Sequence, residues 1–146
     1  MAITSAVCNS FKVEILTATH NFTASSGNTF NLALYTSSAS MGASTTAYTT
    51  TNEIANTSGS SYSAKGKALT SVTPVLSTDT AVCDFANISW TSASFTSRGC
   101  LIFNDSAASD QSVCAIDFGG DKTVTSGTFT IEFPAATAGN AIIGIA

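Results

Sequence analysis

Serine and threonine make up roughly three residues in ten of this chain, and such small or β-branched residues fit pleated strands and tight turns. The chain is nevertheless hydrophobic on balance, with a mean hydropathy of +0.28 and only 10% charged residues. A disordered chain would combine high charge with low hydrophobicity, and this chain has neither property. The sequence therefore predicts a compact β-protein with a weakly charged surface.

Length and charge exclude several classes of protein. A chain of 146 residues suits one domain, here residues 1–146. The net charge is -4 and the 5 basic residues are scattered, so we expect no binding to nucleic acid. No apolar run approaches the ~18 residues of a membrane span, so no membrane partner is expected. The first residues lack a basic region followed by an apolar one, which favours synthesis and folding in a cytosol.

Alternating apolar and polar residues recur between turn signals and predict about eight short strands. No segment has a convincing amphipathic helical pattern, so under about a tenth of the chain is expected to be α-helix. The pattern predicts an all-β fold, an antiparallel β-sandwich of jelly-roll or Greek-key type, with a closed barrel as the alternative. The expected strands include residues 11–15, 29–36, 72–76, 81–85 with 88–90 after a short break, 98–104, 112–118, 128–134 and 140–146.

Four segments have more specific predictions. Residues 98–104 are nearly all apolar, which favours a central strand buried on both faces, with residues 112–118 as its hairpin partner. Pro74 within a strand pattern indicates an edge strand. Gly119 and Gly120 predict a tight link between strands. Residues 37–52 are small or hydroxyl-bearing and predict a long surface loop, with one short helical turn near residues 43–46.

Titratable side chains form no constellation that suggests catalysis, and none that indicates a cofactor or a metal. His20 is the only histidine and has no relay pattern around it, so we expect it at the surface or at the end of a sheet. Asp117 and Asp121 flank the glycine pair and have the oxygen ligands that Ca²⁺ prefers. Their spacing does not match an EF-hand loop, so solvated acids beside a plain turn are the favoured interpretation.

The cysteines are too far apart in the sequence for a zinc motif. We expect buried free thiols, and one disulfide is the alternative if the protein meets an oxidising medium. The four are Cys8, Cys83, Cys100 and Cys114.

Aromatic side chains have two interpretations. Trp90, together with Tyr35, Tyr48 and Tyr62, would suit a carbohydrate-stacking platform, but such side chains also fill sandwich cores, and Trp90 has a core setting. Tyr48 differs because it lies in the polar segment of residues 37–52, so we expect it to be exposed or at an interface. The candidate interface residues are Thr46, Tyr48, Thr50 and Asn52.

Four stretches, taken in order, resemble small virion-associated proteins of tailed bacteriophages of aquatic bacteria. They are FNLALYTSSA at residues 30–39, TTAYTTTNEI at 45–54, CAIDFGGDK at 114–122 and GTFTIEFP at 127–134. The resemblance extends over most of the chain from about residue 30 onward. It implies a structural part of the virion and brings no catalytic residues with it.

Two functions follow from the resemblance and the composition. The first is a capsid decoration or cement protein, expected as a homotrimer on the major capsid protein, because a weakly charged β-domain suits repeated lateral contacts. The second is a tail, neck or fibre component, with residues 37–52 and Tyr48 facing a host glycan. An enzyme is not expected, since no base and nucleophile are visible.

Overall fold

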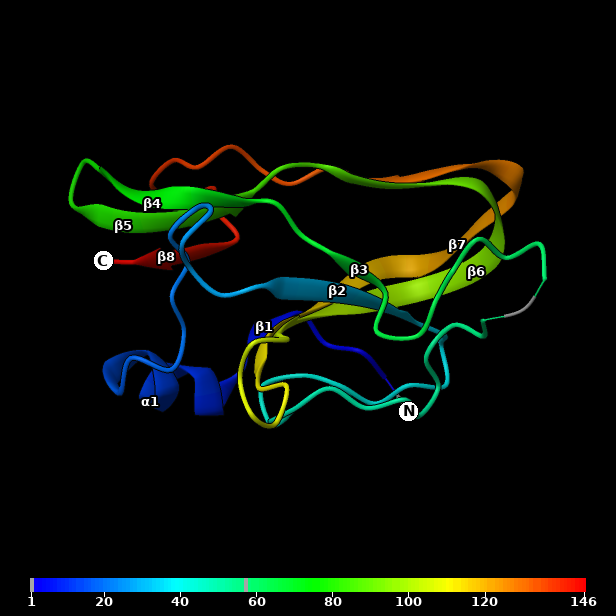
Figure 1. Cartoon of the computed structure of the whole chain (residues 1–146), viewed down its shortest axis with the longest axis horizontal. Coiled ribbons are helices and arrows are strands. Elements are labelled where there is room, and N and C mark those ends of the chain that lie inside the picture. The colour runs from blue at the N-terminus through cyan, green and yellow to red at the C-terminus, as the bar shows by residue number, and fades with distance from the viewer. Residues whose placement is uncertain (1, 57) are drawn as a thin grey trace.

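Two antiparallel sheets form the body of the protein in the computed structural model, which describes residues 2–56 and 58–146 (Figure 1). The larger sheet has the strand order β1-β7-β6-β2-β3, and the smaller has the order β4-β5-β8. The predicted antiparallel β-sandwich is therefore confirmed. The elements are β1 (Ala6–Val7), α1 (Asn9–Leu16), β2 (Phe30–Tyr35), β3 (Lys67–Ala68), β4 (Ser71–Ser77), β5 (Thr80–Phe85), β6 (Ile88–Asn104), β7 (Ser112–Ile131) and β8 (Ile143–Ile145).

The hairpin of β6 and β7 is the largest element of the fold. The expected central strand is confirmed, since residues 98–104 of β6 lie in the middle of the larger sheet and pair with the start of β7. The prediction of short strands is wrong here, because β6 has 17 residues and β7 has 20. In much of the hairpin the paired residues are serine and threonine, without an alternation of apolar and polar side chains. The sequence pattern therefore does not reveal how long the two strands are.

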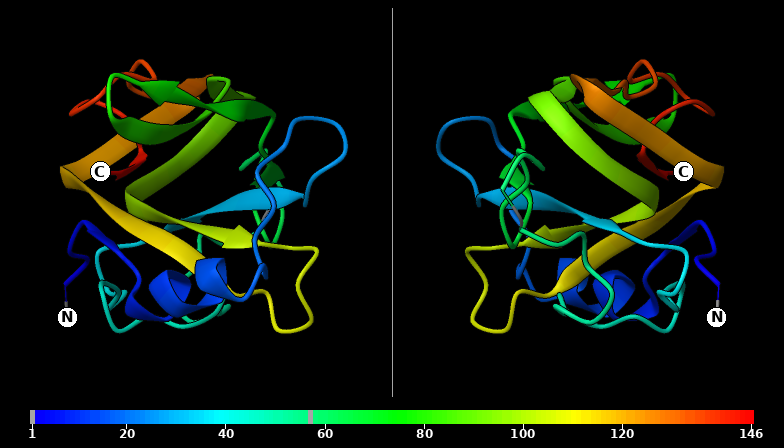
Figure 2. Two further views of the ribbon diagram at one scale, coloured as in Figure 1. Left: turned by 90° about the vertical axis from the view of Figure 1, so that its left-hand side faces the viewer. Right: turned by 90° about the vertical axis from the view of Figure 1, so that its right-hand side faces the viewer.

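The long hairpin is bent where its register shifts between Ser97 and Gly99 (Figure 2). Extra residues in a ladder bend the strand and increase its twist. Gly119 and Gly120 lie inside β7 at this corner, with Gly119 at φ +75°, so the predicted link between two strands is wrong. Because the hairpin bends, its far half reaches toward the layer of the smaller sheet.

Both sheets contribute to one hydrophobic cluster. The ring of Phe30 on β2 stacks on Phe22 at 4.3 Å between centroids and lies 5.9 Å from Phe85 on β5. Trp90 is 4% exposed and packs edge-on against Phe95, which confirms its place in the core. Aromatic pairs at such distances add stability beyond the apolar area they bury.

Helix α1 stands where the alternation of residues 11–15 predicts a strand, so that prediction is wrong. Phe11 and Ile15 are four residues apart and therefore share one face of a helix. Phe11 is buried, whereas Val13 is 64% exposed. Residues 11–15 therefore fit both the two-residue period of a strand and the 3.6-residue period of a helix. The contacts of Phe11 with Phe22 and His20 favour the helix. This is the one α-helix among the described residues and has 8 residues, so the low helix content is confirmed.

Pro74 lies on β4, an edge strand of the smaller sheet, as predicted. The register between β4 and β5 shifts between Val72 and Val75. Pro74 therefore lies at an irregularity, where its missing N–H costs no hydrogen bond to the neighbouring strand.

Candidate interaction surface

Residues 36–54 form a strap that is fixed along the larger sheet at three places. Its backbone makes isolated bridges from Met41 to Ile3, from Ala47 to Gln111 and from Glu53 to Tyr35. The helical turn expected near residues 43–46 is instead a single turn closed by a 3.0 Å bond from Thr45 N to Gly42 O. The predicted long loop is thus present, and it is held against the body of the protein.

The four candidate interface residues differ in exposure. Thr46 and Thr50 are exposed, whereas Tyr48 and Asn52 are half-buried. Asn52 has φ +61°, which asparagine tolerates, at a turn closed by a 3.2 Å bond from Glu53 N to Thr50 O. Its side chain donates to the carbonyl of Ser38 at 3.0 Å. The strap therefore presents two free threonine side chains from a fixed backbone, and their role in an interface stays a prediction.

Both the ring and the hydroxyl of Tyr48 have partners within the protein, so the alternative of a fully exposed side chain is wrong, whereas its place at an interface stays a prediction. The ring stacks on Phe103 with 4.7 Å between centroids. The hydroxyl donates to Oε2 of Glu53 at 2.6 Å and accepts from the backbone N of Lys65 at 3.2 Å. Burial and the neighbouring Glu53 carboxylate raise the pKa of Tyr48 to about 12. A polar neighbourhood in the sequence did not reveal this aromatic partner.

Glu53 joins two tyrosines, and the sequence analysis missed this role. Its Oε1 accepts a 2.7 Å bond from the hydroxyl of Tyr62, which itself accepts from Leu34 N at 2.9 Å. Tyr62 is 1% exposed, and burial raises its pKa further than that of Tyr48. The carboxylate thus satisfies two phenol donors and connects the strap to the core.

Lys65 adds an ion-pair cluster beside the strap. Its Nζ lies 2.8 Å from Oδ1 of Asp105 and 2.8 Å from Oδ2 of Asp110, and 5.8 Å from the centroid of the Tyr48 ring. The two carboxylates raise the pKa of Lys65. These acids flank the turn between β6 and β7, so the cluster holds that turn next to the strap.

His20 is buried, so a surface position is wrong, and it lies beside Asn104 at the end of β6, in agreement with the alternative of a sheet end. Its Nε2 lies 2.8 Å from Oε2 of Glu14, and its Nδ1 lies 3.1 Å from Nδ2 of Asn104. The side chain is 0% exposed and its ring lies 5.0 Å from that of Phe11. The 2.8 Å distance between His20 and Glu14 is that of a catalytic dyad. The His20 imidazole is enclosed by aromatic rings, so a substrate could not reach it.

The two acids near the glycines both interact with Arg98, and together they raise its pKa. Asp117 Oδ1 accepts from Nε of Arg98 at 2.8 Å and from Gly119 N at 3.1 Å. The Arg98 guanidinium lowers the pKa of Asp117. Among the residues that the structure describes, no three histidine, cysteine or acidic side chains are grouped to hold a metal ion.

The thiols are free and buried, as predicted. Burial raises the pKa values of Cys83 and Cys114 to about 12, and those of Cys8 and Cys100 are raised as well. Tyr35 and Tyr62 are also buried, so these aromatic residues do not form the alternative carbohydrate platform.

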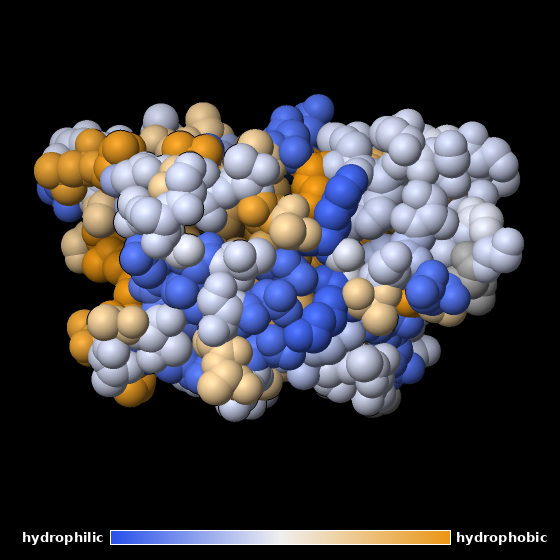
Figure 3. All heavy atoms as spheres, viewed as in Figure 1, coloured by the Kyte–Doolittle hydropathy of each residue, from blue (hydrophilic) through white to orange (hydrophobic). Residues whose placement is uncertain are grey.

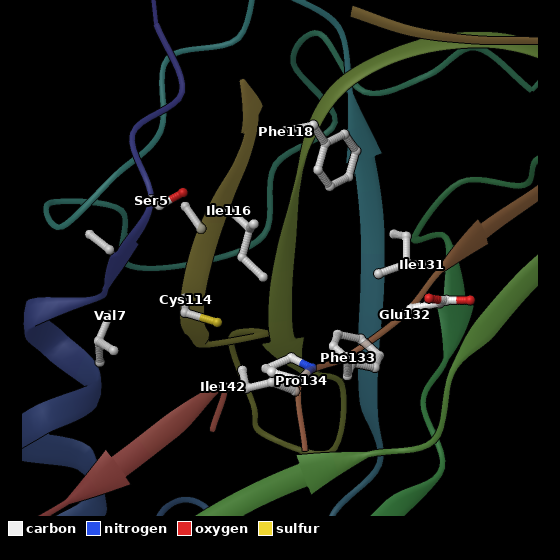
Figure 4. Close-up of a pocket in the computed structure, with 12 residues that line it drawn as sticks. Ser5, Val7, Cys114, Ile116, Phe118, Ile131, Glu132, Phe133, Pro134 and Ile142 are labelled. Atoms are coloured by element: carbon white, nitrogen blue, oxygen red, sulfur yellow. The ribbon is translucent and has the colours of Figure 1, made fainter. Parts of the chain in front are cut away.

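An apolar groove, here called the seam groove, runs between β1, β7 and the segment after β7 (Figure 4). Its volume is about 460 Å³, and the side chains of Ile116, Ile131 and Phe133 contribute to its walls. A second groove, here called the end groove, shares Val7 with it and has a volume of about 330 Å³. The end groove lies between α1 and β8 and is lined by Val7, Phe11, Lys12, Ile15, Leu16, Ile143, Gly144 and Ile145.

No family model, curated protein or solved structure matches this chain. The resemblance to phage virion proteins therefore stays a prediction. Within residues 2–56 and 58–146, no helix has the length and apolar character needed to cross a membrane.

Proposed function

We propose that this chain is a non-enzymatic structural protein of a bacteriophage virion that decorates the capsid and stabilises its shell. Its partners in the proposal are the major capsid protein and further copies of itself, with a homotrimer as the expected assembly. Synthesis takes place in the host cytoplasm. The resemblance of the four sequence stretches supports the phage context, and the strap supports a role in contact.

One observation carries the proposal. The strap is fixed to the core through Tyr48, Glu53 and Tyr62, while the side chains of Thr46 and Thr50 stay exposed. A surface that is already ordered loses little conformational entropy when it binds. Hydroxyl groups can make hydrogen bonds to a neighbour without burying a charge. Such a rigid, uncharged surface suits the many equivalent contacts of a shell.

The positions of the titratable side chains agree with a structural role. His20, Glu53 and Asp117 each bond to fixed protein groups. These bonds orient buried donors and acceptors within the fold, which is how polar side chains stabilise a β-sandwich.

Copy number in purified virions tests the proposal. A decoration protein is present at on the order of hundreds of copies, comparable with the major capsid protein, because it follows the symmetry of the shell. Densitometry that gives about a dozen copies, with labelled protein at the tail, would replace it with a tail, neck or fibre function. Absence from the particle would overturn both.

The contact surface has its own test, in which stripped particles are mixed with purified protein. Thr46→Asp and Thr50→Asp each place a charge on the strap, and we expect binding to fall at least about tenfold because the contact must then desolvate a carboxylate. Thr125→Asp is the matched control, since Thr125 is an exposed threonine on β7. Equal binding of all three variants would exclude the strap as the contact.

A further inference from the structure

The exposed apolar side chains of this protein gather on three elements. All six large apolar side chains that are exposed among the described residues lie on α1, β4 and β8. Leu16 is 87% exposed and Leu76 is 71% exposed. Figure 3 shows apolar surface at the end of the molecule where these elements lie. Contiguous exposed apolar surface in a soluble protein marks an interaction site. The six are Val13, Leu16, Val72, Val75, Leu76 and Ile145.

The inner face of the smaller sheet extends beyond the core at this end. Leu76, Ala81 and Ile145 lie in one row across β4, β5 and β8, so their side chains share a face of the sheet. Two residues further along, Cys83 and Ile143 occupy the same face and are buried in the core. The row is therefore a continuation of the core face that nothing in the described chain covers.

Helix α1 lies across the end groove from this row (Figure 1). Leu16 and Ile15 line the groove from the helix, and Ile145 lines it from β8. The end of the sandwich thus has two apolar edges, the sheet tip around Leu76 and the helix around Leu16.

The edges of the sheets differ in how they are protected. On β4, Pro74 and a register shift interrupt the edge, and β3 has the charged Lys67. Carbonyl groups of the strap accept backbone hydrogen bonds on either side of β1, that of Met41 from Thr4 N and that of Ala43 from Asn9 N. Strand β8 has the sequence Ile-Gly-Ile, with neither a charge nor a proline. Short length, proline, charge and irregularity are the usual means of blocking association at an edge, and β8 has only its short length of 3 residues.

Opposite charges flank the apolar surface. Lys12 lines the end groove beside Leu16, and Asp79 lies in the turn between β4 and β5, close in sequence to Leu76. Both are exposed, and neither forms an ion pair within residues 2–56 and 58–146. The helix edge is therefore apolar with a positive charge, and the sheet tip is apolar with a negative charge.

We propose that this end of the sandwich binds a second copy of the chain in a two-fold symmetric pair, with the sheet tip of each copy on the helix α1 of the other. A two-fold contact brings two different patches together twice, because residue i meets residue j and j meets i. Leu76 of one copy then packs on Leu16 of the other, and Asp79 meets Lys12. The pairing covers the uncharged edge region around β8 at the same time.

This pairing goes beyond the proposed function and does not depend on it. It uses α1, β4 and β8, whereas the proposed capsid contact uses the strap. A trimer formed through another surface would become a hexamer through this contact. The solution mass therefore tests the pairing alone, and binding to particles tests the proposed function alone.

Molar mass by light scattering, measured on the full chain over a range of concentrations, is the first test. We expect wild-type protein to have twice the mass of Leu16→Asp and of Leu76→Asp, because each variant places a carboxylate in the apolar contact. Thr125→Asp adds the same charge on β7 and should keep the wild-type mass. Circular dichroism confirms that each variant is folded. Equal masses for all four proteins would overturn the proposal.

Charge exchange is the second and more specific test. Lys12→Asp and Asp79→Lys should each weaken the pair at least about tenfold, since each brings like charges together. The double variant restores both ion pairs with their signs reversed, so its dissociation constant should return to within about threefold of wild type. In Lys12→Asp the new carboxylate lies near the N-terminus of α1, where it interacts favourably with the helix dipole, so this variant should keep the helix. A double variant as weak as the single ones would overturn the two-fold arrangement.

Discussion

The hydroxyl of Tyr48 donates a 2.6 Å hydrogen bond to Oε2 of Glu53, and Oε1 of the same carboxylate accepts from Tyr62 at 2.7 Å. One acidic side chain therefore connects the strap, through Tyr48, with the core, through Tyr62. We expect Glu53→Ala to lower the free energy of unfolding by about 3 kcal/mol, because it leaves two phenol donors without their acceptor. Chemical denaturation of the two proteins measures the difference.

Two variants make this prediction specific. Glu53→Gln keeps one acceptor oxygen, so we expect a smaller loss of about 1 kcal/mol. Glu132→Ala removes an exposed glutamate and should stay within about 0.5 kcal/mol of wild type. A Glu53→Ala protein as stable as Glu132→Ala would contradict the structural role of the carboxylate.

The tyrosines should make the fold sensitive to alkali. Burial, together with the Glu53 charge, raises the pKa values of Tyr35, Tyr48 and Tyr62, that of Tyr48 to about 12. The stability from the neutral phenols is complete below pH about 10, the ordinary pKa of tyrosine, and is lost as the pH rises above it. At pH about 10, ultraviolet absorbance should detect no tyrosinate in the folded protein. Normal titration of any of the three phenols with the fold intact would contradict this.

The thiols should be unreactive until the protein unfolds. All four are buried, and burial raises their pKa values, so little thiolate is present at neutral pH. We expect a thiol reagent to modify none of them in native protein and all four in denaturant. Modification of even one native thiol within minutes would show that its site opens easily. Added reductant should leave the unfolding transition unchanged.

The sequence revealed the apolar strands at the centre of the larger sheet. Residues 30–35 form β2, and residues 98–104 pair with the start of β7, because apolar side chains there meet a continuous core. Residues 91–97 of β6 and 119–127 of β7 were not predicted as strand, because they are rich in serine, threonine and glycine, which occur equally in loops. The hydroxyls of Thr96 and Thr123 contact each other across the ladder at 2.8 Å, a pairing that no local pattern reveals.

The sequence did not predict the contacts of the polar residues in the strap and the core. Tyr48 lies among threonines, and only the fold places its ring on Phe103, far away in the chain. His20 likewise stands between the polar residues Thr19 and Asn21, and it is buried through long-range contacts such as that with Asn104. Local composition predicts exposure only where no distant element supplies a partner.

Asn104 provides the last prediction, because it organises the surroundings of His20. It is fully buried at the end of β6, where its Nδ2 lies 3.1 Å from Nδ1 of His20, 3.2 Å from the carbonyl oxygen of Thr19 and 3.1 Å from Oδ1 of Asn28. Its Oδ1 accepts from Ser106 N at 3.0 Å. Because the amide nitrogen of Asn104 can only donate, its position facing Nδ1 of His20 favours the tautomer with the proton on Nε2, facing Glu14. Nitrogen NMR of labelled histidine should therefore show Nδ1 as the unprotonated nitrogen.

Asn104→Ala removes a donor and an acceptor from this buried cluster at once. We expect a loss of about 3 kcal/mol in the free energy of unfolding, because the Ser106 amide and Nδ1 of His20 then have no partner there. Asn56→Ala changes an exposed asparagine and should stay within about 0.5 kcal/mol of wild type. Since the cluster joins residues 19 and 20 to the end of β6, hydrogen exchange should also rise in both segments of Asn104→Ala. Exchange that rises only next to residue 104 would mean that the two segments are held together by the aromatic rings alone.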